Sequence, residues 1–358
     1  MVSDFERAIP EFSLILPIGI SFYTFNSLSY TIDLYNGKTK KARSWLHFMA
    51  FISFFPHLVA GPIIRAKDVL LQLEKKNKIN ITEIYHGIGT CIWGLFQKMV
   101  VADNLAIFVN NTYSDNNVSD TLTWWVCGLA FSFQIYFDFN GYSTIARGLA
   151  KLCGIHFRLN FNYPYRSLSF NEFWKRWHIS LSTFFRDYVY IPLGGNRKGF
   201  WKAELNKWLT MLLSGLWHGA NTTFLVWGAL HALFLSLETM IGKFILKSIH
   251  LPRIINFGIV FGGTLLAWVF FRSPDIDFAF YVVKCMLSFE HSASYRTLLT
   301  GGVSVWIILA VLLEFIPFTS RFLIKSKYWF IQVFIWSLMI VTILFFRGPE
   351  QDFIYFQF

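Results

Sequence analysis

The clearest candidate for chemistry is His218, which lies late in an apolar run that restarts at Phe224. An ionisable side chain at membrane depth is costly, so it usually faces an internal cavity and marks a functional site. Desolvation would keep its imidazole neutral, which is the form that a general base needs. Gly215 and Gly219 would let backbone or a ligand approach the ring. The alternative is a histidine that hydrogen-bonds a neighbouring helix and holds the fold.

His178 is the second candidate, because it follows a segment rich in Trp, Lys and Arg at residues 173–177. Guanidinium groups bind phosphate in a bidentate way and indole rings stack on flat ligands. Trp174, Arg176 and Trp177 therefore suit a phosphate-bearing or adenine-bearing ligand. The same residue types also anchor any interfacial helix to lipid headgroups, and the residues alone leave both interpretations open.

These residues belong to an amphipathic stretch, residues 170–190, whose apolar side chains recur at helical spacing. Charged side chains lie among these apolar residues, and they include Lys175, Arg176, Arg186 and Asp187. The pattern predicts a helix lying in the cytosolic interface. It ends at residues 191–196, where one Pro and two Gly predict a turn.

No metal centre is expected from the histidines and cysteines. His231 lies 13 residues beyond His218, which is roughly 20 Å along a continuous helix. The two cannot share a metal unless that helix breaks. Other histidines without a partner at ligand spacing are interpreted as structural: His47, His57, His86 and His156. The cysteines stand singly and indicate neither a disulfide framework nor a zinc site: Cys91, Cys127, Cys153 and Cys285.

Asp138, followed closely by Asn140, is expected at the cytosolic end of a membrane span. It can pair with the basic region that follows or merely mark the membrane boundary, and structural pairing is the preferred interpretation. The chain contains no P-loop, dinucleotide fingerprint, nucleophile elbow or H-E-x-x-H motif. Common nucleotide, hydrolase and zincin chemistries therefore lack support.

The elements that must position these residues are membrane segments. Of the 358 residues 54% are hydrophobic and only 15% charged, which is too apolar for an ordinary soluble domain. Several runs approach the roughly 20 apolar residues that cross a bilayer, namely residues 12–34, 122–137, 254–271, 303–318 and 329–346. We expect an all-α, polytopic membrane protein with about eight to ten transmembrane or re-entrant helices. Without an internal repeat or linker, residues 1–358 are expected to form a single membrane domain.

The charge predicts the orientation of the chain. The formal net charge is +11, and residues 140–207 contain eleven Lys and Arg against three Asp and Glu. The positive-inside rule places this basic segment in the cytosol or at its interface, and the acidic loop 110–120 outside. No nucleic-acid motif accompanies the charge. Residues 45–64 lie between two basic clusters and contain Pro and Gly, which favours a re-entrant or interfacial element.

Taken together, these motifs resemble the membrane-bound O-acyltransferases, and within them the bacterial alginate O-acetyltransferase branch. The similar blocks are residues 16–25, 54–63, 136–143, 173–178, 186–188, 192–197, 216–220 and 353–358. They run in family order from near residue 14 to the end of the chain.

The resemblance implies that His218 is the signature histidine of the family, placed in a central funnel through the membrane, with His178 as the second prominent histidine. These two are the expected catalytic residues. The expected substrate-binding residues are Trp174, Arg176, Trp177, Arg186, Asp187, Trp217 and Asn221, and no metal is expected.

The resemblance also implies transfer of an acetyl group from a cytosolic donor, acetyl-CoA, toward an exported polysaccharide such as alginate. A separate extracytoplasmic acetyltransferase would make the final ester. The implied location is the cell membrane, or the inner membrane of a Gram-negative cell, with lipid, donor, polysaccharide and transferase as partners and no nucleic acid. The open alternatives are D-alanyl transfer to teichoic acid, a transporter without covalent chemistry, and an inactive scaffold.

Two departures from the family pattern stand out. Family members usually carry further membrane helices before the block at residues 16–25, so the chain is expected to lack that N-terminal helix set, as a fragment, a late start or a short member. Thr222 follows Asn221 where the branch commonly has a tryptophan. This change can alter the cavity near His218 without removing the chemistry.

Overall fold

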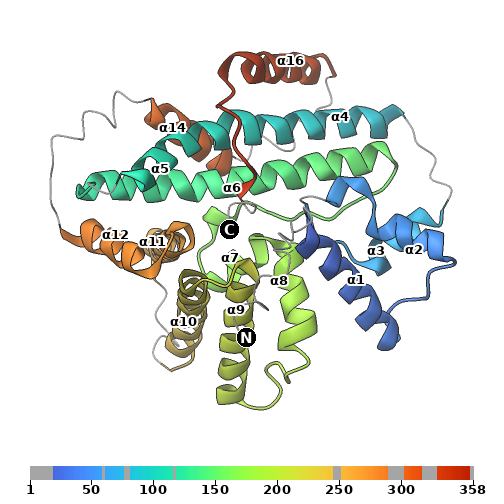
Figure 1. Cartoon of the computed structure of the whole chain (residues 1–358), viewed down its shortest axis with the longest axis horizontal. Helices are drawn as coiled ribbons and strands as arrows, with labels where there is room; N and C mark the ends of the chain where they lie inside the picture. The colour runs from blue at the N-terminus through green and yellow to red at the C-terminus, as the bar shows by residue number, and fades with distance from the viewer. Residues whose placement is uncertain are drawn as a thin grey trace, which may run out of the picture.

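The computed structural model describes residues 19–58, 61–75, 81–115, 118–244, 251–288, 302–316 and 329–354, and these residues form helices and no strand (Figure 1). The helices are α1 (Ile20–Tyr35), α2 (Trp45–Ile52), η2 (Phe55–His57), α3 (Ala66–Leu73), α4 (Ile81–Phe96), η3 (Gln97–Ala102), α5 (Asp103–Ser114), α6 (Thr121–Leu152), η4 (Pro164–Arg166), α7 (Phe170–Arg176), α8 (Ile179–Phe185), η5 (Arg186–Tyr190), α9 (Phe200–His218), α10 (Thr222–Phe244), α11 (Arg253–Arg272), α12 (Ile276–Ser288), α14 (Val303–Phe315) and α16 (Trp329–Phe346).

Among the described residues, four helical stretches are long and apolar enough to cross a membrane: Ile81–Ser114, Thr222–Lys243, Arg253–Arg272 and Trp329–Phe346. The helix α14 is also apolar but shorter. The expected all-α, multi-pass membrane protein is therefore confirmed. Only 17% of the span Trp329–Phe346 is buried in the protein, against 72% of an apolar 18-residue window within Ile81–Ser114, so the former is suited to face lipid and the latter to fill the interior.

The expected span at residues 12–34 begins outside the described residues, and its described part is α1. Residues 16–18, 59–60 and 355–358 of the similar blocks also lie outside them. Residues 45–64 contain the eight-residue α2 and the short η2, neither long enough to cross a bilayer. A re-entrant or interfacial position for this segment stays a prediction.

The helices α4 and α6 run side by side across the molecule (Figure 1). They touch at Gly94 and Gly141, because a Cβ atom on Gly94 would lie 2.7 Å from the carbonyl oxygen of Gly141. Small residues at such a crossing let the two backbones approach closely. The 32-residue α6 also packs against α5, α11, α12 and α14.

Asp138 lies within α6 and not at the end of a span, because the helix continues to Leu152. Its carboxylate pairs with Lys98 of η3 at 2.9 Å, and Lys98 also binds Asp103 at 2.6 Å. Structural pairing of Asp138 is confirmed, but its partner lies outside the basic segment 140–207. The other oxygen of Asp138 accepts a hydrogen bond from the N–H of Ile354, which fastens the last described residues to α6.

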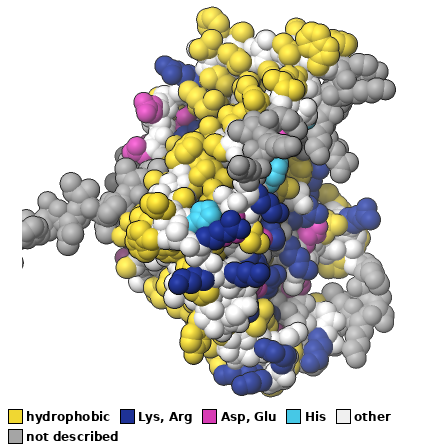
Figure 2. Space-filling view, turned by 90° about the vertical axis from the view of Figure 1, so that its right-hand side faces the viewer, with side chains coloured by type: hydrophobic (Ala, Val, Ile, Leu, Met, Phe, Trp, Pro, Cys, Tyr) yellow, Lys and Arg dark blue, Asp and Glu magenta, His cyan; other side chains and the backbone are white. Residues whose placement is uncertain are grey.

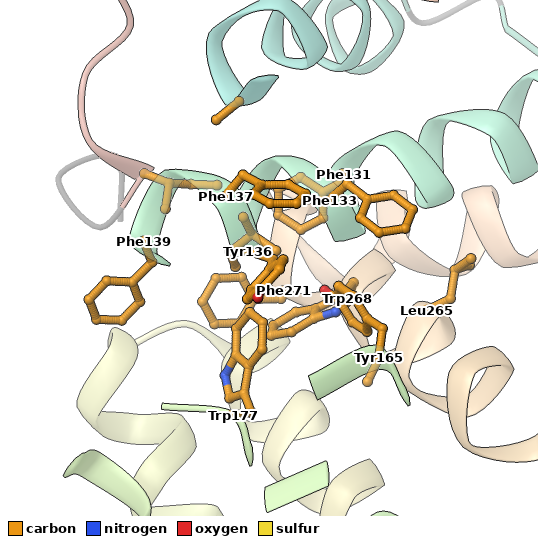
Figure 3. Packing of buried hydrophobic residues seen from close by; sticks show 14 of the residues in the cluster. Phe131, Phe133, Tyr136, Phe137, Phe139, Tyr165, Trp177, Leu265, Trp268 and Phe271 are labelled. Atoms are coloured by element: carbon orange, nitrogen blue, oxygen red, sulfur yellow. The ribbon is translucent and has the colours of Figure 1, made fainter. Parts of the chain in front are cut away.

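The core below α6 is built from aromatic rings. Figure 3 shows Tyr136 and Phe137 of α6 above Trp177, Trp268 and Phe271. The rings of Trp177 and Trp268 lie 4.9 Å apart, and those of Trp268 and Phe271 lie 5.3 Å apart. This packing joins the segment around residue 177, which precedes the candidate His178, to α11.

Candidate functional site

The stretch at residues 170–190 is not the single helix that its spacing predicts. It forms α7 and α8, which are separated at Trp177 and His178, and continues as the π-helical turn η5. His178 has a left-handed φ of 39°, which costs a non-glycine residue roughly 1–3 kcal/mol and persists only where the surroundings hold it. The break turns the imidazole of His178 into the protein, where it is 0% exposed. The predicted turn at residues 191–196 is confirmed.

The apolar side chains of this stretch are buried inside the protein instead of lying on a membrane surface. They are Phe173, Trp174, Trp177, Leu181, Phe184 and Phe185. Trp177 packs on Tyr136 and Trp268 in the core, so it supports the site and presents no free face for stacking on a ligand. Trp174 lines a cavity and remains a candidate for ligand contact.

His178 is oriented by Asn160, whose side-chain oxygen lies 3.2 Å from its Nδ1 atom. The same oxygen accepts hydrogen bonds from the backbone N–H and the hydroxyl of Ser180. Because this oxygen is an acceptor, Nδ1 of His178 donates the proton and Nε2 carries the lone pair. Burial, with a further contribution from nearby His218, lowers the pKa of His178 well below its ordinary value and keeps it neutral.

His218 is the last residue of α9, and the chain turns back through Gly219 to Asn221 into α10. The two helices pack closely, since a Cβ atom on Gly215 would lie 2.3 Å from the carbonyl oxygen of Phe224. The ring of His218 is enclosed by aromatic neighbours, with Trp227 at 5.0 Å and Phe271 at 5.1 Å between ring centroids.

The chain breaks between α9 and α10 after His218, so the separation of a continuous helix does not apply to His218 and His231. His231 is fully buried on α10, with Trp227 4.9 Å and Trp174 5.0 Å from its ring. Within the described part of the chain, no three His, Cys, Asp or Glu side chains gather closely enough to hold a metal ion.

The two candidate histidines meet at Trp217. The ring of His218 lies 4.7 Å from this indole, and that of His178 lies 6.3 Å from it. Phe25 of α1 stacks on the same indole at 5.3 Å. His178 and His218, which are 40 positions apart in the sequence, thus contact the same indole. The imidazole of His178 is neutral there.

The helix α8 separates two cavities. The first, of about 470 Å³, has Lys175, Arg186 and Lys207 in its wall together with apolar residues such as Trp174 and Met211. It reaches Ser214, one turn before His218 on α9. This combination of basic and apolar walls suits a long ligand with an anionic end.

The second cavity, of about 360 Å³, lies on the other side of α8 and shares Arg186 with the first. Its basic residues include Arg65, Lys67 and Arg158. Figure 2 shows Lys and Arg side chains gathered over the middle and lower part of one face of the molecule, while the top of that face, on the side of α16, is mostly hydrophobic.

Asp187 organises the cations near α8 by binding Arg65 at 2.6 Å and Arg186 at 2.7 Å. Burial alone would raise the pKa of Asp187, but the hydrogen bonds from Arg186 and Arg65 hold it below its ordinary value. Asp187 is therefore an ionised anchor for the two arginines. Arg186 keeps 59% of its side chain exposed and can also reach a ligand.

Two further predicted site residues are engaged in contacts within the protein. Arg176 pairs with Glu172 at 2.8 Å and donates to the carbonyl oxygen of Asn162. Asn221 donates to the carbonyl oxygen of Pro274 at 2.8 Å and accepts from the N–H of Thr223 at the start of α10. These contacts assign both residues a structural role in this geometry. The side chain of Thr222 is exposed and bonds Asn221.

Sequence reasoning missed three residues that the geometry makes important: Asn160, Arg65 and Lys207. Asn160 lies in an extended segment without a recognisable motif, so only its contact with His178 reveals it. Arg65 belongs to a basic cluster that the charge pattern indicated, but its partner Asp187 is 122 residues away. Lys207, bound to Glu204 at 2.9 Å, lies in the wall of the larger cavity beside α8.

The chain is similar in sequence to a known family of membrane enzymes. The family model described as MBOAT, membrane-bound O-acyltransferase family, matches residues 38–273. A probable alginate O-acetylase of Pseudomonas aeruginosa is 42% identical over 305 residues, which cover 84% of this chain and 57% of that protein. A peptidoglycan O-acetyltransferase of Helicobacter pylori is 36% identical over 301 residues, covering 76% and 57%.

A teichoic acid D-alanyltransferase of Bacillus subtilis is more distant, with 29% identity over 265 residues that cover 68% of this chain and 64% of that protein. The chain thus spans less than two thirds of the length of these curated relatives.

Proposed function

Because this chain belongs to the membrane-bound O-acyltransferase family, we propose that it moves an acetyl group from cytosolic acetyl-CoA toward an exported polysaccharide such as alginate. The higher identity to an alginate O-acetylase, 42%, than to a D-alanyltransferase, 29%, supports acetyl over D-alanyl transfer. The proposal treats residues 1–358 as one domain of the inner membrane. A separate extracytoplasmic acetyltransferase would complete the ester.

The donor is proposed to bind along α8. Its phosphates would contact the cations of the smaller cavity, chiefly Arg65 and Arg186, whose guanidinium groups match phosphate oxygens. The acyl-bearing arm would follow the apolar wall of the larger cavity past Trp174 toward Ser214. This path leads to the C-terminal end of α9, where His218 lies.

In the proposed chemistry His218 is the general base. It removes the proton from a hydroxyl of the acceptor or of a carrier, whose oxygen then attacks the thioester carbonyl carbon. The carbon–sulfur bond breaks, and the leaving thiolate takes up the proton held by the imidazole. General base assistance contributes about 10²–10⁴-fold to a rate. His178 and the arginines of the α8 cavities position the donor.

The observation that carries this proposal is the meeting of His178 and His218 at Trp217, beside cavities with basic and apolar walls. A fully buried His178 and a partly exposed His218, each with defined neighbours at a break in the helices, are expected of a site for proton transfer. A purely structural role for His218 would need no cavity with basic and apolar walls one helical turn away, at Ser214.

The test of the function is chemical analysis of the native cell after deletion of the gene. Ester-linked acetate on the exported polysaccharide should disappear, and should return when the wild-type gene is restored. Unchanged acetate together with a loss of D-alanyl esters would replace this proposal by D-alanyl transfer. Unchanged esters of both kinds would favour a transporter. Deletion of an inactive scaffold would also remove the acetate, so turnover of acetyl-CoA by the purified protein with its partner transferase separates that case.

A further inference from the structure

A third cavity, of about 290 Å³, lies away from α8 between α4, α6, α14 and the segment at residues 159–163. Its wall is largely aromatic or aliphatic, with Trp93 of α4, Tyr163 and Leu313 of α14 as examples. Thr144 and Arg147 of α6 also line it. The proposed acyl transfer uses none of these residues.

Arg147 has no counter-charge among the described residues. Its Nε atom is buried without a hydrogen-bond partner there, and the described lining of the cavity contains no Asp or Glu. The acidic residue next to the lining is Glu314, whose carboxylate accepts from the N–H of Tyr165 at 3.1 Å and interacts with the charges of Arg166 and Arg176 instead of Arg147. A guanidinium held inside a membrane protein without an anion is costly, and such a residue is usually retained for a ligand.

We propose that this cavity binds the phosphate of an anionic membrane lipid headgroup. The guanidinium of Arg147 can hold two phosphate oxygens, and the hydroxyl of Thr144 with the amide of Asn162 supplies neutral donors in the same wall. The cavity is enclosed in part by the apolar helix α14, which carries exposed apolar side chains such as Ile308 and Leu312, so a lipid lying along this helix can reach it.

The position of the cavity favours a headgroup over a lipid tail or a soluble donor. Leu159 lines both this cavity and the smaller basic cavity beside α8, so the two cavities adjoin at this residue. Basic pockets between membrane helices near a positively charged face are typical sites for anionic lipid headgroups. The described lining of this cavity has one arginine, which matches the single phosphate of a lipid headgroup. The smaller cavity beside α8 has several cations, which match a donor with several phosphates.

Native mass spectrometry of the full-length protein in detergent tests this proposal by titration with phosphatidylglycerol and, separately, phosphatidylcholine. The wild type should bind one phosphatidylglycerol that phosphatidylcholine does not replace. Arg147→Ala should weaken that binding by about tenfold or more, and Arg147→Lys by less. Arg253→Ala is the matched control, because Arg253 is exposed at the start of α11 and outside this cavity, and its affinity should equal that of the wild type.

Equal affinity of wild type and Arg147→Ala for phosphatidylglycerol would overturn the proposal. Displacement of the lipid by millimolar inorganic phosphate would also overturn it, because the site would then hold a free anion. Should Arg147→Ala fail to fold, Leu313→Trp decides the matter by filling the cavity without removing the charge. It should weaken phosphatidylglycerol binding, and unchanged binding would contradict a headgroup site here.

Discussion

The Nδ1 atom of His178 lies 3.2 Å from the side-chain oxygen of Asn160. Because Ser180 donates to the same oxygen, this contact selects the form of His178 that keeps its lone pair on Nε2. The replacement Asn160→Ala should leave the ring free to take another tautomer and orientation. Acetate on the polysaccharide should fall by about ten- to a hundredfold, as when a positioning partner of a ligating histidine is removed.

The control for this prediction is Asn256→Ala, a partly buried amide on α11 outside both cavities beside α8, which should leave acetylation unchanged. A merely structural role for Asn160 would lower the amount of folded protein, and the activity per folded molecule would stay the same. Membrane abundance measured beside acetate separates the two cases.

Arg186 is expected to govern donor binding more than turnover, because its side chain lies in the walls of both cavities beside α8. The change Arg186→Gln should raise the KM for acetyl-CoA by about tenfold, the loss of one charge-assisted contact, with kcat within about twofold. Steady-state transfer of labelled acetate in membrane vesicles measures both constants. Lys284→Gln, an exposed cation on α12, should change neither, and an equal response of the two variants would argue against a donor site at α8.

Asp187 should stabilise the fold in a pH-dependent way through Arg65 and Arg186. Its pKa is lower in the folded protein, so its contribution is present above the ordinary Asp pKa of about 3.9 and is lost as the pH falls through the lowered value. Asp187→Asn should therefore cost about 1–3 kcal/mol at neutral pH and progressively less below about pH 4.

Thermal unfolding in detergent across this pH range measures the effect. The matched variant Asp277→Asn, at an exposed position on α12, should unfold like the wild type at each pH. A deficit of Asp187→Asn that persists unchanged into acid would mean that the ion pairs do not supply the stability.

Gly215 should be indispensable for the close contact of α9 and α10 that positions His218. An alanine Cβ would lie 2.3 Å from the carbonyl oxygen of Phe224, so Gly215→Ala forces the helices apart and should cost about 1–3 kcal/mol. Gly262→Ala adds the same methyl group on α11, where nothing lies within 4 Å, and should be neutral or stabilise by up to ~1 kcal/mol. Equal melting temperatures for the two variants would contradict this packing.

Residue type and hydropathy were enough to predict an all-α membrane protein and to select His178 and His218. They were not enough to predict that the two rings meet at Trp217. That depends on the left-handed backbone of His178 and on the turn after His218, neither of which residue spacing indicates. The prediction of a single helix at residues 170–190 was wrong for the same reason.

The apolar run before the acidic loop 110–120 was expected to span the membrane, but the sequence did not show the bounds of the stretch Ile81–Ser114. Lys98 and Asp103 interrupt its apolar pattern, and they bind each other at 2.6 Å. Each of these residues lowers the hydropathy of the segment in the sequence, but in the folded protein the two opposite charges neutralise each other. Asn160 escaped prediction for a related reason, because its role exists only through a contact with His178.

The proposed mechanism requires that His218 acts as the base in acetyl transfer. The most direct test replaces His218 by Gln in the native cell, confirms equal membrane abundance, and measures ester-linked acetate per sugar unit by mass spectrometry. His47→Gln, at a partly buried position on α2, serves as the control. We predict a loss of about a hundredfold or more for His218→Gln and none for His47→Gln; acetate within twofold of the wild type in His218→Gln would contradict the account.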